Sequence, residues 1–393
     1  MPLATRKFED IITFTRNSAA TYWDENGVLQ AAAIDEPRLD HDPLTGKSLG
    51  ILIEEQRTNY ITDSEDPSTW VARESMTYAG SFTERGLTFG EFVPSIGGGG
   101  NALVTDAVYE LISPDGLGEY SGSFIIKGNG IKRVIVRRLT AATPSTYQAV
   151  INLETGELEP FSGEKNGVLT DLGGGFYKYT YPFEFESETT GGYQIAPLDG
   201  SDSDGVNSFF VAAMQYEKGA FPTSYIPTSG SAVTRTGEVA QINDPSTWLR
   251  EEFAAKISGR SFGNRSPGAT FMSFQADPQD NNDRLEFRIQ DTLARALSSD
   301  GSARFSDVIL QDPNGEVDLA FSRNEQGGSH LAVNNGGEIL SASNAHHMPS
   351  SPWGIFLGDR VVTPSTYSLN GYLLSVEVSP VYKRLEELKE WVS

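Results

Sequence analysis

The sequence predicts an all-β protein, with an N-terminal β arm, two tandem β-sandwiches and a short C-terminal helix. Short runs of Val, Ile, Phe, Tyr and Thr recur along the chain, and the 40 Gly and 20 Pro fall between them. This pattern is typical of many short strands joined by tight turns. Hydrophobic residues make up 38% of the 393 residues, which is enough for packed cores throughout. A chain of this length predicts two or three domains.

The formal net charge of −23 and the absence of Cys argue against several classes of function. A strongly acidic protein repels phosphate backbones and anionic lipid headgroups, so we expect no binding to nucleic acid. Without Cys there are no disulfides, no thiol catalysis and no Cys-based zinc sites. The N-terminus lacks the apolar segment of a signal peptide, and no stretch approaches 18 apolar residues. We therefore expect a protein made in a cytoplasm, without membrane insertion.

Residues 1–60 are predicted to form an arm of short strands and turns. Asn26-Gly27 is a strong hairpin sequence between apolar residues at 20–23 and 28–30. A second turn at 42–46 precedes the strand predicted at 49–54. The arm contains too many charged residues for a core of its own, so we expect it to pack against a neighbour.

Residues 61–238 are predicted to form the first sandwich. Apolar residues run consecutively at 122–127 and 209–214, as expected for strands covered on both faces. Two sheets must then pack face to face. The other clear strands are at 133–139, 147–153 and 176–185.

Residues 239–380 are predicted to form the second sandwich, and residues 381–393 the C-terminal helix. At 284–289 apolar and charged residues alternate, which predicts a strand with one face in water. Leu385, Leu388 and Val392 lie on one stripe of the helix. A helix of about three turns is marginal alone, so it must dock on the second sandwich or on a partner chain.

Four segments resemble phage and prophage tail-fibre or head-fibre proteins. Three of them lie in the predicted arm, ITFTRNSAATY at 12–22, EPRLDHDP at 36–43 and GILIEEQRTN at 50–59. The fourth, QYEKGAFPTSYIPT at 215–228, resembles the segment that closes the first jelly roll of such proteins. Residues 317–321, 330–337 and 369–376, with the helix at 385–392, resemble a concanavalin A-like lectin/glucanase or laminin-G-like jelly roll.

This resemblance implies a non-enzymatic structural protein on the surface of a virion, assembled in the cytoplasm of the host. The subunit would belong to a tail fibre, a spike, or a head fibre or decoration. The arm would dock on other virion proteins, and the jelly rolls would bind host cell-surface polysaccharide during adsorption. A homotrimer is expected, because the arm cannot bury its apolar residues alone. A virion-associated polysaccharide hydrolase and a purely architectural protein without a ligand stay open as alternatives.

The hydrolase alternative depends on Glu184, Glu186 and Glu188, which project from one face if they lie on a strand. Retaining glycosidases use two carboxyl groups about 5–5.5 Å apart. The structural interpretation is a solvated strand face in a very acidic protein, and we favour it because a fold analogy places no sugar between these acids.

A structural calcium ion is the one cofactor for which the sequence offers ligands. Asp199, Asp202 and Asp204 place carboxylates in one Gly- and Ser-rich loop, and hard cations prefer oxygen ligands. The loop lacks the Glu and the flanking helices of an EF-hand, so ordinary turn residues are the favoured interpretation. The adjacent His346 and His347 would chelate one zinc ion poorly, because neighbouring residues of an extended chain point to opposite sides. We therefore expect them to be an ordinary pair in an exposed loop.

Aromatic side chains are the candidates for sugar binding, because sugars stack their apolar faces on flat rings. Large aromatic residues are more often part of a core than of a binding surface. The glycan-binding candidates are Trp70, Tyr78, Tyr193, Trp353 and Tyr367.

Overall fold

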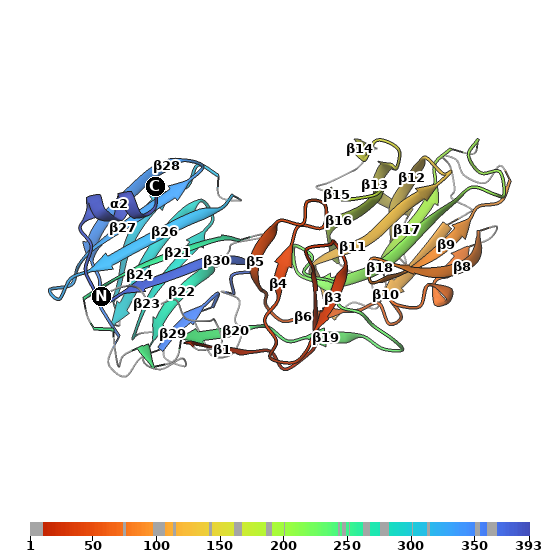
Figure 1. Cartoon of the computed structure of the whole chain (residues 1–393). Coiled ribbons are helices and arrows are strands. Elements are labelled where there is room, and N and C mark those ends of the chain that lie inside the picture. Colours follow the sequence, from red (N-terminus) through yellow and green to blue (C-terminus); the bar gives the residue numbers. More distant parts are fainter. Residues whose placement is uncertain are drawn as a thin grey trace.

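The computed structural model confirms the all-β prediction, with two β-sandwiches and one helix near the C-terminus (Figure 1). It describes residues 11–393 with gaps at 74–75, 97–106, 113–114, 141–143, 161–166, 186–190, 200, 243, 246–248, 251, 262–267, 276–282, 301, 313–314, 350–353 and 360–367. The boundaries predicted for the arm, the two sandwiches and the tail stay predictions, but the strand pairing shows which segments share a sheet.

The first sandwich consists of two antiparallel sheets with six strands each. One sheet has the order β14 (Glu157–Pro160), β13 (Pro144–Asn152), β12 (Arg133–Thr140), β17 (Gly191–Pro197), β10 (Ala107–Ile112) and β7 (Val71–Arg73). The other has the order β15 (Val168–Gly173), β16 (Phe176–Phe185), β11 (Gly118–Asn129), β18 (Ser208–Lys218), β9 (Leu87–Val93) and β8 (Thr77–Glu84). Their inner faces bury an aromatic core that includes Phe124, Tyr193 and Tyr216. A 3-10 turn at Pro67–Thr69 precedes β7.

The second sandwich consists of two antiparallel sheets with seven strands each. One sheet has the order β1 (Ile12–Thr15), β20 (Val239–Ile242), β29 (Gly354–Leu357), β22 (Ala269–Gln275), β23 (Asp283–Gln290), β24 (Leu293–Asp300) and β25 (Ala303–Ile309). The other has the order β28 (Glu338–Ala345), β27 (Gly328–Asn335), β26 (Val317–Arg323), β21 (Phe253–Ser261), β30 (Gly371–Ser379), β5 (Ser48–Ile53) and β4 (Leu39–His41). Phe253, Phe287 and Phe321 are among the side chains buried between them.

The N-terminal segment is interwoven with both sandwiches, which changes how the predicted arm is understood. Strand β1 pairs with β20, and β5 pairs with β30, so the arm supplies a strand to each sheet of the second sandwich. The hairpin of β2 (Ala20–Trp23) and β3 (Leu29–Ala32) forms at Asn26-Gly27 as predicted. Strand β6 (Arg57–Asn59) pairs with β19 (Val233–Arg235). The neighbour that the arm needs is therefore this same chain, and the predicted homotrimer loses that argument.

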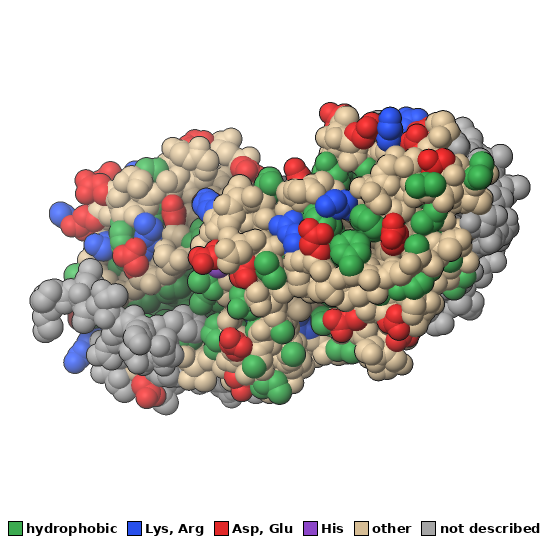
Figure 2. Space-filling model, turned by 45° about the vertical axis from the view of Figure 1, so that its right-hand side comes forward, with side chains coloured by type: hydrophobic (Ala, Val, Ile, Leu, Met, Phe, Trp, Pro, Cys, Tyr) green, Lys and Arg blue, Asp and Glu red, His purple; other side chains and the backbone are tan. Residues whose placement is uncertain are grey.

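The space-filling view shows two lobes with a notch between their upper parts (Figure 2). The N-terminal strands β3, β4 and β5 lie between the two lobes in the ribbon view (Figure 1). Acidic side chains are scattered over both lobes on the face seen in Figure 2. Within the described residues, no helix is long and apolar enough to cross a membrane.

Two expectations about exposure are wrong. On β23 the charged face is covered, because Glu286 is fully buried and forms ion pairs with Arg284 at 3.0 Å and Arg288 at 3.2 Å. His346 is buried rather than in an exposed loop, and its ring nitrogens bond the hydroxyls of Ser298 and Ser306. Burial, with nearby arginines, lowers the pKa of His346 to about 4. In both places the polar groups supply each other's hydrogen bonds, which an alternating sequence pattern does not reveal.

The C-terminal helix α2 (Leu385–Trp391) docks on the second sandwich, one of the two sites predicted for it. Leu388 and Val392 are buried against Ala320 of β26 and Ala332 of β27. Asn334 donates to the carbonyl of Val392 at 2.7 Å, which fixes the end of the helix. The small side chains of the sheet allow the helix to approach closely.

The docking predicts a specific effect of the substitution Leu388→Ala. The variant should lose about 2–5 kcal/mol of local stability, because the buried leucine fills space between helix and sheet. A helix this short depends on docking, so its amide hydrogens should exchange faster in the variant. Hydrogen exchange measures this, with the exposed Glu390→Ala as control. Equal protection in both variants would show that the leucine contributes no docking energy.

Candidate functional site

A pocket of about 230 Å³ lies where the N-terminal segment, the first sandwich and the second sandwich meet. Its lining comes from β2, β3, β4, β9, β11, β16, β18 and β30, from Leu52 and Glu54, and from the loop at 222–225. Pockets for drug-sized ligands measure about 300–1,000 Å³, so this one suits a single small unit, such as one ring of a polymer.

The floor of the pocket is the outer face of the sheet that contains β11, β16 and β18. The pairing of β11 with β18 has a bulge between Ser123 and Ile125, and Ala213 there adopts a positive φ of 52°. Such bulges redirect side chains and occur beside functional sites. Lys178 pairs with Ile125 and therefore lies on the same face.

Asn59 holds this bulge in place. The fully buried amide of Asn59 donates to the carbonyls of Met214 at 3.3 Å and Ile226 at 2.9 Å. Its oxygen accepts from the backbone N–H groups of Ile61 and Tyr216, each at 3.1 Å. One side chain thus satisfies backbone groups that the irregular pairing leaves open.

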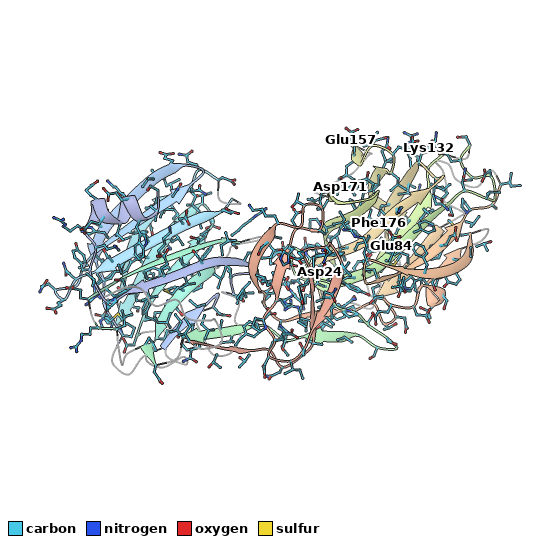
Figure 3. All side chains as sticks on the ribbon, in the orientation of Figure 1. Asp24, Glu84, Lys132, Glu157, Asp171 and Phe176 are labelled. Atoms are coloured by element: carbon cyan, nitrogen blue, oxygen red, sulfur yellow. The ribbon has the colours of Figure 1, made fainter. Side chains whose placement is uncertain are left out.

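The β2–β3 hairpin forms one wall of the pocket. Trp23 and Leu29 pack on the outer face of the first sandwich, beside Phe89 and Phe176. The turn requires Gly27, because its φ is +68° and a Cβ there would lie 2.5 Å from the carbonyl oxygen of Pro43. Figure 3 places Asp24, at the start of this turn, near the middle of the molecule.

Asp40 is a buried carboxylate in the pocket wall. Its Oδ1 accepts from the backbone N–H of Trp23 at 2.6 Å, and its Oδ2 accepts from the hydroxyl of Tyr372 at 2.9 Å. Burial raises the pKa of Asp40 above its usual range, although these two hydrogen bonds act in the opposite direction. Tyr372 belongs to β30, so this pair connects the N-terminal segment with the second sandwich.

Behind the pocket lies a cluster of three arginines and two glutamates, all at most 1% exposed. Arg16 pairs with Glu238 at 3.1 Å. Arg38 contacts Glu54 at 2.9 Å and Glu238 at 2.5 Å, and Arg235 contacts them at 3.4 and 3.6 Å. Buried charges are tolerated only when they are paired in this way.

Glu54 joins this cluster to the pocket. Its two oxygens accept from the backbone N–H of Ser224 at 2.8 Å and from the hydroxyl of Ser224 at 2.6 Å. Burial alone raises the pKa of Glu54, but Arg235, Arg38 and these hydrogen bonds outweigh burial and lower it to about 2. Glu54 is therefore ionised at neutral pH.

The three aromatic candidates that the structure describes do not line this pocket. Trp70 and Tyr193 are in the core, where Tyr193 donates to the carbonyl of Ser123 at 2.6 Å, so neither ring offers a face to a sugar. This corrects the prediction, because the sequence did not reveal which side of the sheet each ring occupies. Tyr78 is half-buried against Phe92 and does not line the pocket. Trp353 and Tyr367 lie outside the described residues.

Among the described residues, the predicted carboxylates do not gather into a site. Glu184 is exposed on β16, while Glu186 and Glu188 lie outside the described residues. Asp199 holds Arg133 through two bonds at 2.7 and 2.8 Å.

The other two residues of the calcium candidate also have partners. Asp202 accepts from the backbone N–H of Lys132 at 3.4 Å, and Asp204 accepts from the N–H groups of Val206 and Asn207. Across the described part of the chain, no group of three His, Asp or Glu residues could hold a metal ion. The calcium hypothesis stays a prediction.

The chemical motifs of the sequence do not include the pocket residues. Tyr22, Asp40, Glu54 and Tyr225 all lie in the four segments that resemble fibre proteins. The resemblance of these four segments to fibre proteins, in turn and strand residues together, was the one sequence feature that pointed to these positions. What the sequence could not show is that segments at 12–59 and 215–228 meet in space.

Comparisons with known proteins add little beyond the β fold. No family model matches the chain, and no curated protein matches it. A sialidase CBM40 domain of Ruminococcus gnavus is 15% identical, with a TM-score of 0.32, over 38% of this chain and 86% of that one.

Two further solved structures are similar at the same low level. Tailspike protein 2 of bacteriophage CBA120 is 11% identical, with a TM-score of 0.29, over 37% of this chain and 24% of that one. Domains LG4-5 of the mouse laminin α1 chain are 10% identical, with a TM-score of 0.25, over 81% of this chain and 95% of that one. Similarity at this level carries no argument about function.

The charge cluster predicts how stability depends on Glu54 and on pH. The folded pKa of about 2 lies below the ordinary glutamate value of 4.5, so Glu54 stabilises the fold above pH 4.5. This contribution, on the order of 3 kcal/mol, is lost as the pH falls toward 2. Glu54→Gln should therefore destabilise the protein at pH 7, and its deficit relative to wild type should shrink in acid.

Chemical denaturation at several pH values measures this difference. The control is Glu316→Gln, because Glu316 and Lys47 form an exposed ion pair at 4.0 Å. Exposed pairs contribute about 0–1 kcal/mol, so the control should behave like wild type. A Glu54→Gln variant as stable as wild type at pH 7 would contradict the assigned role.

Proposed function

We propose that the chain is a non-enzymatic glycan-binding protein and that the pocket between the sandwiches holds one sugar unit. The pocket carries the proposal, because it combines partly exposed rings with hydroxyl and charged groups. Tyr22, Trp23 and Tyr225 are half-buried and line it beside Ser224. Sugars bind where flat rings meet their apolar faces and polar groups meet their hydroxyls.

A place on the surface of a phage-like particle is part of the same proposal. It is supported by the four segments that resemble fibre proteins, because these segments supply part of the pocket wall and three of the five residues of the buried charge cluster. A single small pocket gives weak affinity, and many copies on one particle convert weak contacts into avidity. Docking through the N-terminal segment and binding to host cell-surface polysaccharide follow as expectations of this proposal. A homotrimer stays an expectation that the resemblance alone implies.

The hydrolase alternative has one observation in its favour, since Asp40 and Glu54 line the pocket with pKa values displaced in opposite directions. Pairs of this kind serve as acid and base in glycosidases. In this protein both oxygens of each carboxylate already accept hydrogen bonds from Trp23, Tyr372 and Ser224. A water or a glycosidic oxygen would have to displace these donors, which favours binding over hydrolysis.

A matched pair of substitutions tests the binding site. Tyr22→Ala removes a half-buried ring from the pocket, and Tyr78→Ala removes a half-buried ring from another part of the first sandwich. A glycan array identifies a ligand for the wild-type protein, and calorimetry then measures its affinity. Tyr22→Ala should weaken binding by about 1–2 kcal/mol, roughly tenfold, while Tyr78→Ala keeps wild-type affinity.

The other outcomes separate the alternatives. Loss of affinity in Tyr78→Ala alone would move the site to the surface around Tyr78. New reducing ends after incubation with the bound polysaccharide would establish a hydrolase. A folded wild-type protein that binds no glycan on the array or on host cells would favour a purely architectural role.

A further inference from the structure

Among the described residues, the pocket cation Lys178 has no ionic partner. It extends from β16, on the same sheet face as Ile125, and its side chain is half-buried. Within the part of the chain that the structure describes, its ammonium group forms no ion pair or hydrogen bond. The arginines of the neighbouring cluster, in contrast, all contact carboxylates.

The carboxylates near Lys178 have other partners. Glu54 is held by Arg38, Arg235 and Ser224. Glu217, fully buried, accepts from Thr223 and from the amide of Gln215 at 2.9 Å.

Asp40 is the remaining carboxylate, and it accepts from Trp23 and Tyr372. Burial shifts the equilibrium of Asp40 toward its neutral form by raising its pKa. The positive charge of Lys178 is therefore not neutralised by direct contact with any of these groups.

We propose that the pocket selects a sugar unit with a single negative charge, a carboxylate or a sulfate ester, which binds the ammonium group of Lys178. The inference rests on the proposed glycan binding and names its substrate class. The rings of Tyr22 and Trp23 hold the apolar face of the sugar, and the anionic substituent points to the sheet. A substituent with two charges is disfavoured by the nearby carboxylates of Glu54 and Glu217.

The energetics of Lys178 agree with an anionic ligand. Burial lowers the pKa of Lys178, although Glu217, Glu54 and Asp40 act in the opposite direction. A charged amine that has lost hydration gains most from a contacting anion. The net charge of −23 opposes the approach of an anionic polymer, but the Debye length at physiological ionic strength is only about 8 Å. The contact within the pocket is screened much less.

Lys178→Gln and the control Lys132→Gln test the inference, because each removes one positive charge. Lys132 is more than half exposed, with Glu154 at 3.8 Å, and lies in the upper part of the first sandwich, away from Asp24 (Figure 3). The probes are an oligogalacturonate, its carboxyl-reduced form, a sulfated carrageenan oligosaccharide and a neutral agarose oligosaccharide. Titration calorimetry with each probe gives the affinities.

The expected result is binding of at least one acidic probe, with a loss of tenfold or more for its neutral counterpart. Lys178→Gln should lose the same factor and remain fully folded, since it replaces a poorly hydrated charge, and Lys132→Gln should bind like wild type. The carboxylate and sulfate probes distinguish the two kinds of anion.

Three results would overturn the inference. Equal affinity for acidic and neutral probes, or unchanged acidic binding in Lys178→Gln, would remove Lys178 from recognition and leave the proposed glycan binding intact. If no probe binds but the glycan array yields a neutral ligand, the anionic preference is wrong. If the array also yields none, the proposed function itself fails.

Discussion

The structure depends on the buried charge cluster of Arg16, Arg38, Arg235, Glu54 and Glu238. Arg16, Arg38 and Glu54 belong to the N-terminal segment, and Arg235 and Glu238 belong to the segment that joins the two sandwiches. The ion pairs of the cluster therefore connect these two parts of the chain. Breaking a buried ion pair costs about 3–5 kcal/mol, because the remaining charge has no water around it. Each charge is acceptable only while the other segments are in place, so the cluster fixes how the N-terminal segment lies against both sandwiches.

The pocket is a consequence of this arrangement. Glu54 reaches from the cluster to Ser224, and Asp40 reaches across to Tyr372, so the charged residues that fix the junction also shape the walls of the pocket. The bulge at Ala213 opens the floor, and Asn59 keeps it open with four hydrogen bonds. A binding site built on paired sheets and buried charges is rigid before any ligand arrives, which lowers the entropic cost of binding.

Features with local causes could be predicted from the sequence, and features with distant causes could not. The hairpin at Asn26-Gly27 and the buried stripe of the C-terminal helix follow from neighbouring residues, and both are present. The pocket depends on contacts between positions 332 apart, for Asp40 and Tyr372, and 170 apart, for Glu54 and Ser224. No periodicity encodes such distances. Tyr193 is a core residue and not the predicted sugar-binding ring. Alternation in a strand does not say which face is covered by a second sheet.

The most direct test of the account is the structure of the protein with a bound oligosaccharide. The account predicts one sugar unit in the pocket, between the ring of Trp23 and the ammonium group of Lys178, with the charge cluster unchanged. A sugar bound at any other surface, with the pocket empty, would contradict it.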